Sequence, residues 1–156
     1  MSTIAATLLP AILAALLLAA AVCDLKSRTI PNGLNLAIAL LAIPFWFASS
    51  LAPWPDMALQ VGVASLVFAF FAAAFAIGAM GGGDVKMVAA VALWLPWQAV
   101  LVMLVIMSLA GGVLTAALMI RRRLARGEGP IEVPYGVAIA FGGLWLISER
   151  FLYQFG

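Results

Sequence analysis

The chain has 156 residues, of which 67% are hydrophobic and only 9% are charged. Soluble domains are about half apolar and about a quarter charged, so this composition indicates an integral membrane protein and excludes an ordinary soluble domain. The formal net charge is +2, but half of the basic residues gather in the segment 121–126, which is typical of a membrane anchor, and we expect no nucleic-acid partner.

Six apolar segments predict six membrane-spanning helices, because about 20 helical residues cross the ~30 Å hydrocarbon layer. In chain order the predicted spans are Ile4–Val22, Leu34–Leu51, Met57–Ala79, Val85–Leu95, Gln98–Ile120 and Tyr135–Ile147. The fourth is short and reaches only about 16 Å, so it either begins below the membrane surface or stops early. We therefore predict an all-α membrane protein whose residues 1–156 form one polytopic domain.

The basic residues predict how this bundle is oriented. If six spans alternate across the membrane, one side receives nearly all of them: Lys26, Arg28, Lys86, Arg121, Arg122, Arg123 and Arg126. The positive-inside rule makes this side cytoplasmic, so both termini are predicted to lie outside. Because Lys26 and Arg28 follow the first apolar segment, we expect it to be a permanent span rather than a cleaved signal peptide. Asp24 and Asp84 then share the cytoplasmic boundary, whereas Asp56 lies on the other side.

The stretch Gly81-Gly82-Gly83-Asp84-Val85-Lys86 joins the third and fourth segments. A charge at the edge of a membrane segment is costly, which makes Asp84 a candidate functional residue. The glycines leave the backbone nearly bare, so an extended peptide or another helix can approach it closely. Asp84 also lies near the start of a helix, where the charged form is favoured, and we expect it to ionise more readily than Asp24.

Two carboxylates that meet share a proton, which provides a general base to activate water and a general acid to protonate a leaving amine. The chain contains no histidine and a single cysteine, Cys23. A conventional metal site needs several such ligands, and a serine or cysteine triad needs a histidine base. We therefore expect neither metal nor cofactor, and an Asp24–Asp84 pair remains as the chemistry that this composition allows.

Asp24, followed by Ile30-Pro31-Asn32 and then by Gly81-x-Gly83-Asp84-x-Lys86, resembles the type IV prepilin peptidases, which are intramembrane GxGD aspartyl proteases. Pro134-Tyr135-Gly136 is also similar to the last segment of that family. The resemblance implies an endopeptidase that removes the leader peptide of Flp-like prepilins at the cytoplasmic face of the bacterial inner membrane. It implies that Asp24 and Asp84 are catalytic. With no paired CxxC motifs, the chain is similar to the short form that lacks the methyltransferase region.

Five further residues complete the predicted active-site loops and are candidates for substrate binding: Gly81, Gly83, Lys86, Pro31 and Asn32. Each has a structural alternative, because glycines also form turns, Pro31 and Asn32 shape the start of a helix, and a lysine anchors a helix at the lipid surface. The expected partners are a pilin-like precursor and membrane lipids. The alternative functions are a small proton-coupled transporter or channel that uses the same aspartates, and a structural subunit of a secretion machine.

Overall fold

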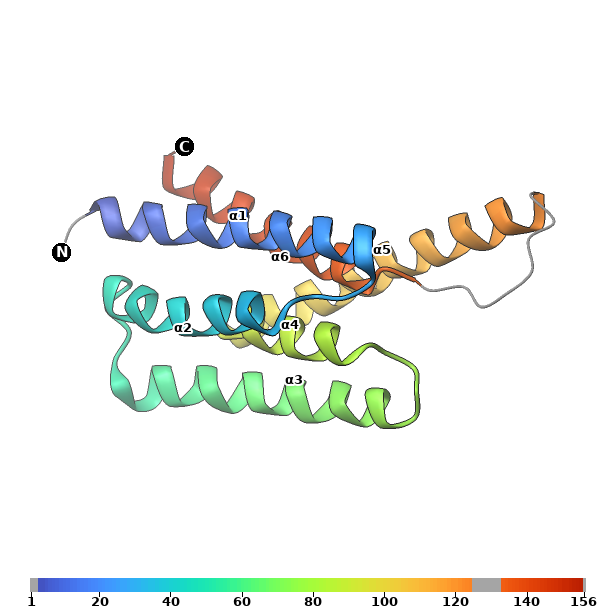
Figure 1. Ribbon diagram of the computed structural model, residues 1–156. Coiled ribbons are helices and arrows are strands. Elements are labelled where there is room, and N and C mark those ends of the chain that lie inside the picture. The colour runs from blue at the N-terminus through green and yellow to red at the C-terminus, as the bar shows by residue number, and fades with distance from the viewer. Residues whose placement is uncertain (1–2, 125–132, 156) are drawn as a thin grey trace.

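The computed structural model describes residues 3–124 and 133–155, and within them the side chains of residues 7–124 and 133–149. This part of the chain is helical throughout, and each predicted apolar segment corresponds to one α-helix (Figure 1). The helices are α1 (Thr3–Ser27), α2 (Asn32–Ala48), α3 (Ala58–Ala76), α4 (Gly82–Ala92), α5 (Trp97–Leu124) and α6 (Tyr135–Phe155). A short irregular turn, η1 (Pro53–Met57), precedes α3. The predicted all-α fold is confirmed.

Successive helices run in alternating directions, so the connections gather at two ends of the bundle (Figure 1). Both chain termini and η1 lie at one end. The α1–α2 connection, the α3–α4 connection and the start of α6 lie at the other, and α5 extends beyond the bundle there. Asp24 in the last turns of α1 and Asp84 in the first turn of α4 therefore share an end. Asp56 lies at the opposite end, where its Oδ2 accepts a hydrogen bond from the backbone N–H of Ala52 at 3.1 Å.

The short helix α4 lies at the centre of the bundle, where it packs against α2, α3 and α6. Most of its side chains are buried, among them Val85, Met87, Val88 and Val91. Because protein surrounds this helix, it can be apolar without being long enough to cross the bilayer. Two indole groups fasten its far end to α2: Trp46 Nε1 donates to Leu93 O at 2.7 Å, and Trp94 Nε1 donates to Ile38 O at 2.9 Å.

Three segments of the described chain are long and apolar enough to cross a membrane: Thr7–Ser27, Pro53–Ala76 and Trp97–Leu124. The helices Asn32–Ala48 and Tyr135–Glu149 are apolar but shorter. The structure thus bears out the number of helices. The six membrane crossings and the orientation with both termini outside stay predictions.

Two helix boundaries differ from the prediction and change the setting of the aspartates. Helix α1 continues to Ser27, because Arg28 N donates to Asp24 O at 3.0 Å, and it ends where Arg28 adopts a left-handed backbone with φ of 54°. Helix α4 begins at Gly82. Asp24 and Asp84 are therefore both helical residues rather than loop residues. Helix α5 also runs past the predicted Ile120 to Leu124, and Arg126 lies outside the described residues.

Candidate active site

Asp24 and Asp84 line one cavity of about 610 Å³ at their shared end of the bundle. The side chains are largely buried, with 4% of Asp24 and 9% of Asp84 exposed. The other walls come from the α1–α2 connection, the α3–α4 connection and the residues around the start of α6, including Tyr135. The sequence predicted that the two carboxylates share one side of the membrane, and the structure places them in one cavity.

Gly136, in the first turn of α6, lies next to the Asp24 carboxylate. Its backbone amide approaches both Asp24 and Asp84. A Cβ atom at this position would lie only 2.9 Å from Asp24 Oδ2 and 2.7 Å from Ile30 Cδ1. The absence of a side chain at position 136 is therefore what lets the start of α6 lie against the end of α1 at the candidate site.

Asp24 has an unused acceptor. Its Oδ2 atom is buried and accepts no hydrogen bond from any described residue. An unsatisfied polar atom in a buried position is costly, and such atoms are found where a substrate or water completes the site. Arg28, at the end of the same helix, lines the cavity and supplies a positive charge near this carboxylate. Asp24 therefore lines the cavity and has one carboxylate oxygen with no hydrogen-bond partner among the described residues.

Asp84 lies outside the three segments that are long enough to cross a membrane. Its surroundings favour the protonated form of its carboxyl group. Burial, with the nearby charge of Asp24 as the second cause, raises the pKa of Asp84 to about 7, against the opposing effect of the Gly81 and Gly136 amides. The prediction that Asp84 ionises more readily than Asp24 considered only the start of the helix. Desolvation outweighs that effect. A carboxyl group that titrates near neutral pH is suited to proton transfer.

The glycines before Asp84 are packed against other residues. A Cβ atom on Gly83 would lie 3.3 Å from Ile30 Cβ, and one on Gly82 would lie 3.4 Å from the ring of Phe75. A Cβ atom on Gly81 would lie 2.9 Å from Oδ2 of Asp84 itself. Only Gly81 of the three lines the cavity. In the structure these glycines therefore allow close packing, and at Gly83 the neighbouring space is already filled by Ile30.

Asn35 is a site residue that the sequence reasoning missed. It lies in the first turns of α2 with 4% of its surface exposed, and its Nδ2 donates to the carbonyl oxygen of Gly83 at 3.0 Å. This bond ties the residue before Asp84 to α2. The signal was an amide side chain inside an otherwise apolar predicted span, where a polar group needs a partner.

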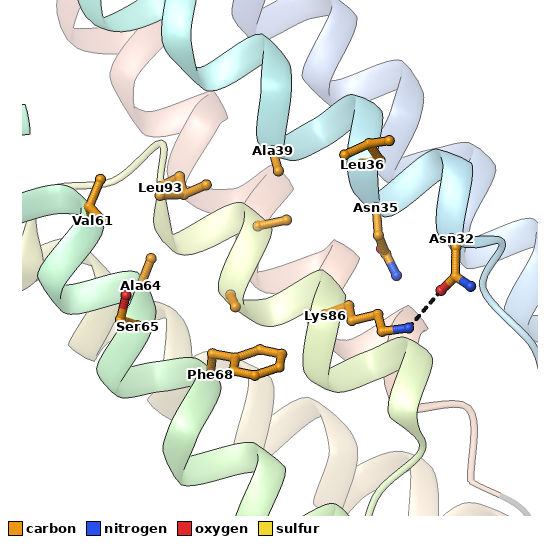
Figure 2. Close-up of a pocket in the computed structure, with 12 residues that line it drawn as sticks. Asn32, Asn35, Leu36, Ala39, Val61, Ala64, Ser65, Phe68, Lys86 and Leu93 are labelled. Atoms are coloured by element: carbon orange, nitrogen blue, oxygen red, sulfur yellow. Dashed lines mark hydrogen bonds between the residues drawn. The ribbon is translucent and has the colours of Figure 1, made fainter.

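The remaining predicted loop residues, Lys86, Pro31 and Asn32, do not line the cavity of the two aspartates. Lys86 Nζ donates to Asn32 Oδ1 at 2.8 Å, and this pair borders a separate groove (Figure 2). Pro31 is exposed and precedes α2 as its N-cap. The structure therefore brings Asp24, Asp84 and Gly81 together and leaves the others outside the cavity. Within the described residues, no group of three or more metal-binding side chains is found.

The sequence of this chain is similar to those of known proteins. The model of a family described as the type IV leader peptidase family matches residues 11–116, a range that contains both aspartates. A prepilin leader peptidase/N-methyltransferase of Pectobacterium carotovorum subsp. carotovorum is 30% identical over 138 residues, which cover 86% of this chain and 48% of that protein. The protein of the same description from Aeromonas salmonicida strain A449 is 29% identical over 148 residues, or 92% of this chain and 48% of its own length. No solved structure matches significantly.

The chain thus spans about half the length of the curated relatives it matches. The family match ends before α6, so it does not include Gly136.

Proposed function

Because the chain belongs to the type IV leader peptidase family, we propose that it is an aspartic endopeptidase that removes the leader peptide of Flp-like type IV prepilins. One observation supports the step from family to mechanism: Asp24 and Asp84 line a single cavity. A buried pair of carboxylates provides both the acid and the base that peptide hydrolysis needs.

In the proposed reaction, Asp24 is the base and Asp84 is the acid. The Asp24 carboxylate takes a proton from a water molecule, whose oxygen attacks the scissile carbonyl carbon. The C–N bond breaks as Asp84 gives its proton to the leaving nitrogen. Transfer of the proton from Asp24 to Asp84 restores the starting state, so one water is consumed and no other reactant is needed. The pKa of Asp84, raised to about 7, supports this assignment because a substantial fraction of this group still holds its proton near neutral pH.

We place the protein in the bacterial inner membrane with the aspartates facing the cytoplasm. The end of the bundle that holds Asp24 and Asp84 also holds Lys26, Arg28 and the end of α5 with its arginines. The positive-inside rule assigns such an end to the cytoplasm. The family match gives no support to the alternative of a proton-coupled transporter, and the two aspartates lie at one end of the bundle rather than along it.

Co-expression of the protein with a Flp-type pilin precursor tests the proposal. Mass spectrometry of the precursor reports whether the leader has been removed. We expect Asp24→Asn and Asp84→Asn each to abolish removal while the protein still inserts into the membrane. Asp56→Asn is the matched control, because this aspartate lies at the opposite end and its asparagine can still accept the bond from Ala52. Normal processing by both dyad variants would refute the proposed mechanism.

A further inference from the structure

A groove lies between α2, α3 and α4 (Figure 2), and Asp84 is not among the residues that line it. Its volume is about 580 Å³, which is within the roughly 300–1,000 Å³ of typical small-molecule sites. Four alanines line the groove, and their small side chains leave room for a ligand: Ala39 on α2, Ala64 on α3, and Ala89 and Ala90 on α4. The walls are apolar along most of their length.

The groove opens toward the lipid-facing surface. Leu36 of α2 and Val61 and Phe68 of α3 line it and are also exposed. Helix α3 belongs to one of the three segments that are long and apolar enough to cross the membrane. Only 11% of the most apolar part of that segment is buried within the protein. An apolar opening beside such a helix faces acyl chains rather than water.

One end of the groove carries the positive charge of Lys86, and no acidic side chain of the described residues is found paired with it. Lys86 and Asn32 lie together at this end, and the ammonium group of Lys86 donates to the neutral amide oxygen of Asn32 (Figure 2). Among the described residues, none of the side chains that line the groove is acidic. The lysine charge is therefore held at the rim of an apolar groove and is available to an anion.

The position of Lys86 matches the level of lipid headgroups. It lies two residues after Asp84 near the start of α4, at the end of the bundle where Lys26 and Arg28 also lie. Basic pockets between membrane helices on the cytoplasmic side bind the headgroups of anionic lipids. The groove combines such a charge with a space for an apolar chain.

We propose that this groove binds one anionic phospholipid, with an acyl chain between α2, α3 and α4 and the phosphate at Lys86. Asn32 holds the lysine at the rim, and the four alanines make room for the chain. The site is separate from the cavity of the two aspartates, and its occupant is a membrane lipid rather than a substrate. The inference therefore stands or falls independently of the peptidase activity.

Native mass spectrometry of the whole protein, released from detergent with added phosphatidylglycerol or phosphatidylcholine, tests this site. We expect one phosphatidylglycerol to be retained in preference to phosphatidylcholine. Lys86→Gln should weaken its retention about fivefold, which corresponds to the ~1 kcal/mol that one lysine contributes near an anionic lipid surface. Ala39→Leu and Ala89→Leu fill the groove from two different helices, and each should remove the bound lipid.

Two variants serve as controls. Lys26→Gln removes a charge at the same end that does not line the groove, and Ala69→Leu adds the same volume on the exposed surface of α3. Both should retain the lipid. Equal retention of phosphatidylcholine, or an equal effect of Lys26→Gln and Lys86→Gln, would overturn the proposal. It would also fail if both groove-filling variants kept the lipid, because the chain would then bind elsewhere.

Discussion

The side-chain amide of Asn35 donates to the carbonyl oxygen of Gly83 at 3.0 Å, so a residue of α2 holds the backbone immediately before Asp84. Ile30 packs against Gly83, and its Cδ1 atom lies next to Gly136. The segment from Ile30 to Asn35 thus connects the end of α1, which carries Asp24, to the start of α4, which carries Asp84. This connection holds the two carboxylates in one cavity.

The first prediction concerns Asn35. Asn35→Leu removes the bond to Gly83 while keeping a similar volume, and it lets the start of α4 move. Because misplacing a catalytic group by about 1 Å costs roughly 100-fold in rate, we expect kcat for leader removal to fall by ~10–100-fold with little change in KM. Steady-state kinetics with a synthetic leader peptide measures this.

The control for Asn35 is Ala42→Gly, which destabilises the same helix by about 1 kcal/mol at a buried position that does not line the cavity. If Ala42→Gly lowers kcat as much as Asn35→Leu, then Asn35 contributes only stability and does not position Asp84.

The second prediction concerns Gly136. Gly136→Ala would place a methyl group 2.9 Å from Asp24 Oδ2 and 2.7 Å from Ile30 Cδ1, so either α6 or the aspartate must move. We expect a loss of activity of roughly 100-fold or more. Adding Ile30→Val removes only the contact with Cδ1, and we expect the double variant to stay inactive because the contact with Asp24 remains.

A matched glycine variant makes this result specific. Gly62→Ala in α3 meets no atom within 4 Å, so its activity should equal that of the parent protein. Full activity of Gly136→Ala would show that the close approach of α6 to Asp24 is not required for the reaction.

The third prediction is a pH dependence. The pKa of Asp84 is raised to about 7, so this residue carries its proton below neutral pH and loses it as the pH rises through 7. If Asp84 is the acid, kcat should fall on the alkaline side, about tenfold for each pH unit well above the pKa. The same shift means that the contribution of this group to folding stability is greatest below its ordinary pKa of 3.8 and declines as the pH rises from there to about 7.

The pH profile of kcat for the parent protein checks this, with Asp56→Asn as a variant whose profile should be unchanged. A profile that is flat between pH 6 and pH 9 would contradict the role of Asp84 as the acid, since the range of about two units on the alkaline side is where its loss must appear.

The pairing of Asp24 with Asp84 could be predicted from sequence because it depends on simple features. Each is a charge at the edge of an apolar segment, and counting segments places both at one side. The residues at which the helices end were harder to predict from the sequence. That α1 includes Asp24 depends on the backbone of Arg28, which takes a left-handed conformation that no pattern of apolar residues indicates.

Contacts between distant segments could not be predicted in the same way. Gly136 meets Asp24 only because α6 returns beside α1, and Asn35 meets Gly83 only because α2 and α4 pack together. Periodicity gives the helices but not which faces meet. The raised pKa of Asp84 could not be predicted for the same reason, because the start of the helix is visible in the sequence whereas burial and the charge of Asp24 belong to the folded protein.

The central claim, that Asp24 and Asp84 act as one catalytic unit, is tested most directly by the kinetics of leader cleavage with purified Asp24→Asn, Asp84→Asn and the double variant. When two residues act together, the losses of activity caused by replacing each of them do not add up. Each single variant should therefore lose as much activity as the double variant. Asp56→Asn should remain fully active. A single dyad variant with parental activity, or losses that multiply in the double variant, would contradict the dyad.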